Sequence, residues 1–290
     1  MKVAVVGVGN MGGPMAACIA RAGHDVMVFD SSQARAQQVA AAHGCHAAAS
    51  LQDLAGAEYV VTMLPTGQVV TDLYLRDGLA GHLRPGTIAI DMSSAEPSGT
   101  RRLGAALTPQ GIVLLDAPVS GGVPRAVLGT LAIMIGGDDA AAIERARPLL
   151  RTMGDRLFDT GGLGTGHAMK ALNNFVAAAG YAACAEALIA GERFGLDPGR
   201  MVEILNVSTG RNFHTDMVLR EHVIGGKFAT GFTLGLLAKD VKIAADLTRD
   251  LDFDAPLVRL VSARFDQARD ALGYASDNSE AIKAWKGQPP

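Results

Sequence analysis

The stretch Met1–Gly13, MKVAVVGVGNMGG, carries the strongest signal for the fold of this chain. An apolar, β-branched run at Val3–Val6 leads directly into the pattern Gly-x-Gly-x-x-Gly at Gly7–Gly12, and a helix-forming stretch begins near Pro14. Glycines allow a tight turn and a close approach of backbone to a pyrophosphate, and the following helix N-terminus offers oriented N–H groups. The stretch therefore predicts a dinucleotide-binding turn between a first strand and a first helix. The alternative is a glycine turn with a structural role only.

Asp30 is a second signal for a dinucleotide, because it ends the next apolar run 18 residues after Gly12. An acid about 20 residues beyond the glycines binds the ribose 2′-hydroxyl of NAD, and its charge repels the 2′-phosphate of NADP. Asp30 therefore favours NAD. Two alternatives stay open: Asp30 is the N-cap of a helix over Gln33–His43, and Arg35 is close enough in sequence to admit NADP.

Further apolar runs alternate with alanine-rich helical stretches up to about Gly162. The runs are Val26–Phe29, Tyr59–Leu64, Thr87–Ile90, Val113–Leu115 and Leu131–Ile135. Continuous apolar strands that alternate with helices are typical of a parallel sheet covered on both faces. We therefore predict an α/β fold in which residues 1–163 form a doubly wound, Rossmann-type dinucleotide-binding domain.

The strand signal stops after the glycine-rich segment Gly161–Gly166, and helical periodicity follows. The segment His167–Phe194 contains no proline and is followed by Gly195, a common helix stop. The candidate N-caps of this helix are Thr160 and Thr165. We expect residues 164–290 to form an all-helical domain for substrate binding and dimerisation, which opens with a long interdomain helix.

The composition indicates a folded protein with about two domains. The 290 residues are 49% hydrophobic and 19% charged, with a formal net charge of -3. A chain of this length buries a full core without disulfide or metal staples, and its charge gives no basis for binding a polyanion. We therefore expect no nucleic-acid partner and no membrane partner.

Cysteine and histidine usage predicts a cytoplasmic protein without a metal. Cys18, Cys45 and Cys184 are odd in number and share no Cys-x-x-Cys spacing, which argues against disulfides and a thiolate zinc site. His43 and His46 lack the His-Glu-x-x-His form and are expected at the surface. The N-terminus does not resemble a signal peptide, and the most apolar stretch is shorter than the roughly 20 residues a bilayer requires.

Lys170 lies near the start of the long predicted helix, among alanine, methionine and leucine residues. A charge is costly to bury, and the cost is accepted where the group has a use. Asn174 follows four positions later, so it faces the same side of the helix. The pair is a candidate catalytic site. The alternative is that Lys170 extends from the helix end to water and Asn174 caps a neighbouring segment.

Four segments resemble the β-hydroxyacid dehydrogenase family, and the resemblance covers essentially the whole chain. They are GVGNMGGPM at Gly7–Met15, DAPVSGG at Asp116–Gly122, GTGHAMKALNN at Gly164–Asn174 and LAKD at Leu237–Asp240. One such segment could arise by chance, whereas four in this order are a specific signal. The resemblance implies that Lys170 is the catalytic acid and base and that Asn174 orients the substrate.

The resemblance also implies a substrate-binding loop. Ser120, Gly121 and Gly122 follow a predicted strand, and small residues there present backbone N–H groups in the crevice where such sheets bind ligands. In the family this loop holds the substrate carboxylate, and Lys239 lies at the edge of the site near the nicotinamide. The alternatives are a plain turn at Ser120–Gly122 and a solvated Lys-Asp pair at Lys239.

Several positions match residues that line the cofactor in the family. The cofactor-binding residues implied are Gly7, Gly9, Asn10, Met11, Gly12, Asp30, Leu64, Pro65, Ser94 and Lys239. The family usually has threonine where Ser94 stands, and serine keeps the hydroxyl.

The resulting hypothesis is the NAD-dependent oxidation of a small 3-hydroxy acid, similar to 3-hydroxyisobutyrate, to its semialdehyde. We expect the site in a cleft between the two domains and a homodimer or homotetramer, as is common in the family. The second domain is too short for the phosphogluconate branch. The stretch Ser208–His214, which includes Arg211, departs from the pattern of the isobutyrate enzyme, so the substrate's side group stays open.

Two other functions stay open. One is the reduction of tartronate semialdehyde or a related aldehyde acid, which uses the same chemistry in the opposite direction. The other is a catalytically silent, nicotinamide-binding redox sensor. The pairing of Lys170 with Asn174 argues against a sensor, because a sensor has no need of a buried base.

Overall fold

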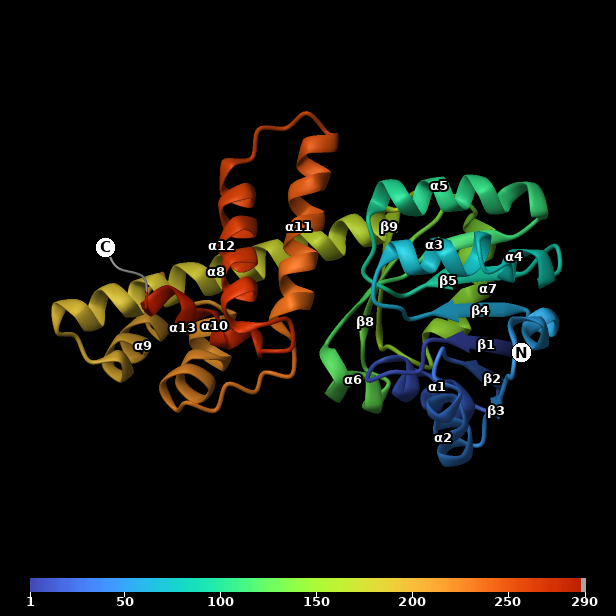
Figure 1. The fold of residues 1–290 in the computed structure, drawn as a ribbon, viewed down its shortest axis with the longest axis horizontal. Helices are drawn as coiled ribbons and strands as arrows, with labels where there is room; N and C mark the ends of the chain where they lie inside the picture. Colours follow the sequence, from blue (N-terminus) through green and yellow to red (C-terminus); the bar gives the residue numbers. More distant parts are fainter. Residues whose placement is uncertain (288–290) are drawn as a thin grey trace. The chain divides into compact units, whose positions relative to one another are not determined.

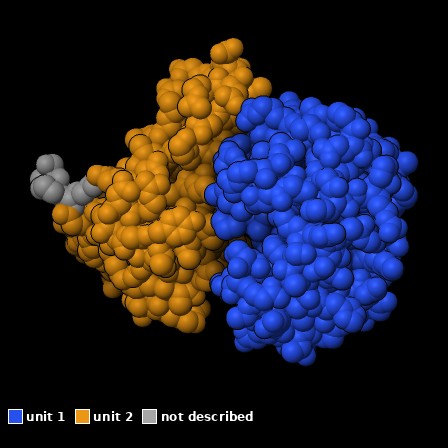
Figure 2. Space-filling model, turned by 45° about the vertical axis from the view of Figure 1, so that its right-hand side comes forward, with its two compact units in different colours: residues 1–170 blue, residues 171–290 orange. Residues whose placement is uncertain are grey.

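The computed structural model of the protein describes residues 1–287. The chain divides into two compact units, Met1–Lys170 and Ala171–Pro290, which Figure 2 distinguishes by colour. The division falls within the helix α8 (Thr165–Phe194), which begins in unit 1 and continues into unit 2.

Unit 1 is built around one mixed β-sheet. Its strands are β1 (Lys2–Val6), β2 (Asp25–Phe29), β3 (His46–Ala47), β4 (Tyr59–Thr62), β5 (Ile88–Asp91), β6 (Val113–Asp116), β7 (Val119–Ser120), β8 (Ala132–Gly136) and β9 (Arg156–Gly161). The order β3-β2-β1-β4-β5-β6 is all parallel, as in doubly wound dinucleotide-binding domains. The predicted Rossmann-type fold is confirmed. The sheet departs from a purely parallel one where β8 runs antiparallel to β6 and β7.

Helices cover both faces of this sheet (Figure 1). They are α1 (Gly12–Arg21), α2 (Gln33–His43), α3 (Gly67–Leu75), α4 (Leu79–His82), α5 (Pro97–Leu107), α6 (Gly122–Leu128) and α7 (Ala140–Leu150). Alternate residues of β1 serve the two faces: Val3 and Val5 belong to the core with α1, α2 and α7, whereas Ala4 and Val6 belong to the core with α3, α4 and α5. The near-continuous burial of β1 explains why its sequence is apolar without alternation.

Unit 2 is helical throughout the part that the structure describes, apart from one isolated bridge, as predicted. Besides α8 it contains α9 (Pro198–Asn206), α10 (Phe213–Met217), a π-helical turn (Leu219–Ile224), α11 (Leu234–Asp250), α12 (Pro256–Leu272) and α13 (Ala281–Lys286). Its core centres on three packed rings, Tyr181, Phe265 and Trp285, with centroids 5.3 to 6.4 Å apart.

The helix α8 ends where the sequence predicts. Its last residue is Phe194, and Gly195 follows with φ +101°, a conformation that favours glycine. By length and composition alone α8 could cross a membrane, a test that core helices of soluble proteins also pass, and 44% of its most apolar window is buried inside the protein. The thiols of Cys18, Cys45 and Cys184 are unpaired and buried, and burial raises the pKa of each.

Candidate functional site

The glycine turn after β1 has the geometry that a dinucleotide requires. Gly7 has φ +87°, and a Cβ on it would collide with the carbonyl oxygen of Met63. A Cβ on Gly12 would collide with the carbonyl oxygen of Gly7. By contrast, a Cβ on Gly9 would meet nothing within 4 Å, so the space outside Gly9, beside the start of α1, is open. The turn therefore fits a pyrophosphate, which would rest on the N-terminal N–H groups of α1.

Asp30 directly follows β2, beside this turn, and holds the turn in place. Its Oδ2 accepts a hydrogen bond from Val8 N (3.0 Å), and its Oδ1 accepts from Ser32 N (2.9 Å). Arg35 Nη1 lies 3.3 Å from Asp30 Oδ1 and makes an ion pair with it. The N-cap of α2 is Ser32, so the alternative reading of Asp30 as a helix cap is wrong.

An open hollow lies next to this turn. Its volume is about 300 Å³, and its lining residues are Val8, Gly9, Asn10, Arg35, Gln38, Val39, Ala42 and His43. Because Gly9 and Arg35 line the same hollow, it adjoins both the glycine turn and the ion pair with Asp30. This is the position at which the adenosine end of a dinucleotide extends from the pyrophosphate in such folds.

Two further loops leave the same edge of the sheet. Thr62 and Asp91 are paired in register at the ends of β4 and β5, so Leu64, Pro65 and Ser94 all follow the carboxyl ends of adjacent parallel strands. Leu64 N donates to Ser93 Oγ (2.9 Å), which ties the two loops together. The carboxyl edge of a doubly wound sheet is where ligands bind.

The loop after β7 exposes backbone. Gly121 and Gly122 have φ +132° and +66°, values that other residues rarely adopt, and both are exposed. Ser120, the last residue of β7, is half-buried beside them. Successive N–H groups in such a turn form a concavity that suits an anion.

Asn174 is anchored by a residue that the sequence reasoning did not single out. Its Nδ2 donates to Asp240 Oδ2 at 2.6 Å, and Lys239 Nζ lies 3.1 Å from Asp240 Oδ1. Asn174 and Asp240 are 7% and 3% exposed, so the Lys-Asp pair is not the solvated surface pair of the alternative reading. The only sequence signal for Asp240 is its place at the end of LAKD. Lys170, one turn before Asn174 on α8, is half-buried.

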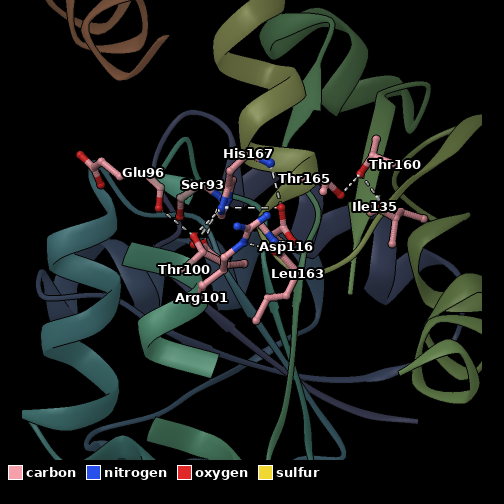
Figure 3. A network of polar contacts seen from close by, with 12 residues as sticks. Ser93, Glu96, Thr100, Arg101, Asp116, Ile135, Thr160, Leu163, Thr165 and His167 are labelled. Carbon is pink, nitrogen blue, oxygen red and sulfur yellow. Dashed lines mark hydrogen bonds and ion pairs between the residues drawn. The ribbon is translucent and has the colours of Figure 1, made fainter. Parts of the chain in front are cut away.

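A second buried polar group lies at the start of α8 (Figure 3). Asp116, at the end of β6, accepts hydrogen bonds from Gly164 N (2.7 Å) and His167 N (2.8 Å). Both predicted caps are wrong: Thr165 Oγ1 donates to the carbonyl oxygen of Gly162 (2.7 Å), and Thr160 Oγ1 donates to the carbonyl oxygen of Ile135 (2.9 Å). The sequence signal for this group is the presence of one aspartate in DAPVSGG and one histidine in GTGHAMK, two segments that are otherwise small or apolar around these residues.

Three further residues that the sequence singled out, Arg211, His43 and His46, lie at the surface. Arg211 is 64% exposed in its side chain and pairs with Asp216 at 3.0 Å. His43 is exposed, and His46 Nε2 lies 3.9 Å from Asp25 Oδ1. Within residues 1–287 no group of three or more His, Cys, Asp and Glu side chains is arranged to hold a metal ion.

Comparison with known proteins accounts for both units. Residues 2–162 match the family described as the NAD binding domain of 6-phosphogluconate dehydrogenase. Residues 164–285 match the family described as the NAD-binding part of NADP-dependent 3-hydroxyisobutyrate dehydrogenase. The chain belongs to the β-hydroxyacid dehydrogenase family.

Relatives of this β-hydroxyacid dehydrogenase cover nearly its full length. It is 38% identical to a 3-hydroxyisobutyrate dehydrogenase of Pseudomonas aeruginosa over 99% of both chains. It is 37% identical to an NAD-dependent L-serine dehydrogenase of the same organism over 88% of each chain. A structure of 3-hydroxyisobutyrate dehydrogenase from Mycobacterium tuberculosis with L-serine has a TM-score of 0.89 at 34% identity and 98% coverage of both chains. The protein is therefore an NAD(P)-dependent oxidoreductase that acts on hydroxy acids.

The proposed role of Asp30 in the preference for NAD over NADP can be tested by substitution. Asp30→Asn removes the charge that repels a 2′-phosphate and weakens the bond to the ribose hydroxyl, so the NADP to NAD ratio of kcat/KM should rise about tenfold or more. Asp25→Asn, at the opposite and exposed end of β2, is the matched control and should leave the ratio unchanged. A wild-type enzyme that already prefers NADP would show that Asp30 does not select the cofactor.

Proposed function

We propose that this enzyme oxidises the hydroxyl of a small 3-hydroxy acid to a semialdehyde, with Lys170 as general base. The observation that supports this most directly is the buried arrangement of Asn174, Asp240 and Lys239 one helical turn beyond Lys170. In this proposal unit 1 binds the dinucleotide, and the helical part of the chain supplies substrate-binding residues and self-association. In this proposal the protein is cytoplasmic. The first candidate substrates are 3-hydroxyisobutyrate and L-serine, because the similar enzymes of Pseudomonas aeruginosa are dehydrogenases of these two compounds.

The protein's part in the reaction is to move one proton and to hold the substrate. When bound, the nicotinamide accepts a hydride from the carbinol carbon. Lys170, in its unprotonated form, takes the hydroxyl proton during oxidation and returns it during reduction. An amide nitrogen carries two N–H donors, and the bond to Asp240 uses one of those of Asn174, so the other is available to orient the substrate oxygen.

Ser120, Gly121 and Gly122 hold the substrate carboxylate in this proposal. Two consecutive exposed glycines with positive φ directly follow Ser120 in the chain. Lys239 adds positive charge and is itself held by Asp240. A site built from N–H donors selects strongly for an acid and weakly among small apolar substituents.

The reverse reaction, reduction of a semialdehyde such as tartronate semialdehyde, is the second candidate. The same residues serve it, since the proton that Lys170 takes in one direction is the proton it gives in the other. A catalytically silent redox sensor is less well supported, because Asn174, Asp240 and Lys239 form a buried charged arrangement that binding of the dinucleotide alone does not require.

Replacement of the base tests the mechanism. Lys170→Ala should lower kcat by roughly 10²- to 10⁴-fold while the affinity for NAD stays nearly unchanged, because the lysine acts on the proton and not on the dinucleotide. The wild-type oxidation rate should rise with pH, because a lysine accepts a proton only when it is unprotonated, and the variant should lose this rise. The control is Lys242→Ala on α11, an exposed lysine paired with Asp246. Full activity of Lys170→Ala would exclude the assignment.

We also propose that the protein self-associates as a homodimer or homotetramer through the helical unit. Its α8 exposes Val176 (66%) and Phe194 (86%), and the following segments add Leu196, Ile204, Val207, Phe213 and Met217, each more than half exposed. Apolar surface of this extent is typical of a contact between subunits. Light scattering at micromolar concentration should therefore return at least twice the mass of the 30.0 kDa chain. A monomer would refute this proposal and leave the chemistry untouched.

A further inference from the structure

We propose that Asp116 is a positioning residue for Lys170: its carboxylate fixes the first turn of α8, and with it the height of the lysine over the sheet. This inference rests on the proposed role of Lys170. It concerns a residue outside the predicted site, in a group of side chains that lies wholly within unit 1.

Asp116 supplies the cap that α8 lacks in its own sequence. The residue before the helix is Gly164, which has no side chain and has φ +89°. In an ordinary cap, the side chain at this position accepts the N–H of the third helical residue. Here Asp116 Oδ2 accepts that N–H, from His167 (2.8 Å), and Oδ1 accepts the N–H of Gly164 (2.7 Å). Its negative charge also lies at the positive end of a 30-residue helix.

The residues packed around the Asp116 carboxylate confine it to one position. The carboxylate is fully buried. A Cβ on Gly136 would collide with its Oδ1, and a Cβ on Gly166 would lie 2.9 Å from its Oδ2 and collide with the carbonyl oxygen of Met134. Glycine at both positions allows the start of α8 to lie directly against β6 and β8. Both carboxylate oxygens are engaged, so the helix start has little freedom to shift.

His167 adds a second attachment on the same turn. Its buried ring bonds Thr100 Oγ1 on α5 through Nδ1 (2.8 Å), and its Nε2 faces Asp91 Oδ2 at 3.7 Å. Asp91 is paired in register with Asp116 on the neighbouring strand, and its other oxygen accepts from Thr62 Oγ1 (2.9 Å). The first turn of α8 is thus held from two strands and one helix (Figure 3).

The position of Asp116 in the chain explains why this matters for the reaction. Lys170 follows His167 by three residues, about one helical turn, so a shift or tilt of the first turn moves the lysine with it. Ser120 follows Asp116 by four residues through β7. The Asp116 side chain therefore connects the strand that leads to Ser120–Gly122, the proposed binding loop for the substrate carboxylate, with the helix that carries Lys170, the proposed base. Misplacement by about 1 Å can cost about 100-fold in rate.

Asp116→Asn is the direct test, because it keeps the shape and replaces one acceptor oxygen with an N–H₂ group that faces a helix N–H. We expect kcat to fall about 10- to 100-fold while the KM for NAD changes less than about threefold. A kcat within about twofold of wild type would overturn the proposal. The control for general stability is Asp139→Ala, which removes the cap of α7 in the same unit, where Asp139 Oδ1 accepts from Ala142 N (2.9 Å). An equal loss of kcat in this control would show that Asp116 acts through general stability and would also overturn it.

A double variant separates positioning from independent effects. If Asp116 acts through Lys170, the Lys170→Ala/Asp116→Asn variant should have the same kcat as Lys170→Ala alone, whereas independent roles would multiply the two losses and contradict the proposal. Full activity of Lys170→Ala would contradict the proposed function itself. Loss of activity in Lys170→Ala together with full activity of Asp116→Asn would contradict only the positioning role of Asp116.

A second variant applies if Asp116→Asn does not fold, as judged by NAD binding and thermal unfolding. Gly166→Ala keeps the carboxylate and pushes the first turn of α8 away from Asp116 and Met134. It should also lower kcat with little change in the KM for NAD. Wild-type kcat in Gly166→Ala would overturn the proposal.

Discussion

The pair of hydrogen bonds from Gly164 and His167 to the carboxylate of Asp116 joins the sheet of unit 1 to the longest helix of the protein. A buried carboxylate is costly unless its oxygens are paired, and here two backbone N–H groups and the positive end of α8 pair them. Because Lys170 lies near the start of α8, within unit 1, the attachment of the first helical turn sets where the proposed base lies over the sheet. The proposed role of Lys170 depends on this attachment, and the proposed role of Asn174 depends on its hydrogen bond to Asp240.

Local chemistry explains which parts of the fold could be predicted from the sequence. Gly7 and Gly12 have to be glycine because a Cβ would collide with neighbouring carbonyl oxygens, and such a requirement leaves a motif of fixed spacing. The buried strands leave unbroken apolar runs, as Val3–Val6 shows. Gly195 ends α8 through its own backbone conformation. At Gly12 and Gly195 the physical cause lies within a few residues of the signal, and at Gly7 the positive φ is local although the crowding by Met63 comes from a distant strand.

The features that could not be predicted depend on residues far apart in the chain. The cap of α8 comes from Asp116, 48 residues before Gly164, so nothing near Thr165 indicates it. Asp240 anchors Asn174 from 66 residues away. The two-residue strand β7 is too short to give a periodic signal, and its antiparallel pairing with β8 follows from tertiary structure. The candidate site is thus visible as residue types in the sequence, whereas the attachments that hold those residues appear only in the fold.

Substrate selection by the acid group is the central functional claim, and one measurement tests it directly. The initial rate of NADH formation is compared for 3-hydroxyisobutyrate and its methyl ester, and for L-serine and its methyl ester, at one pH, with NADP run in parallel. We expect the acids to be oxidised and kcat/KM for the esters to be lower by about 10⁴, because an ester has no negative charge and offers one good acceptor oxygen where a carboxylate offers two. Comparable kcat/KM for an acid and its ester would show that the site does not select the acid group.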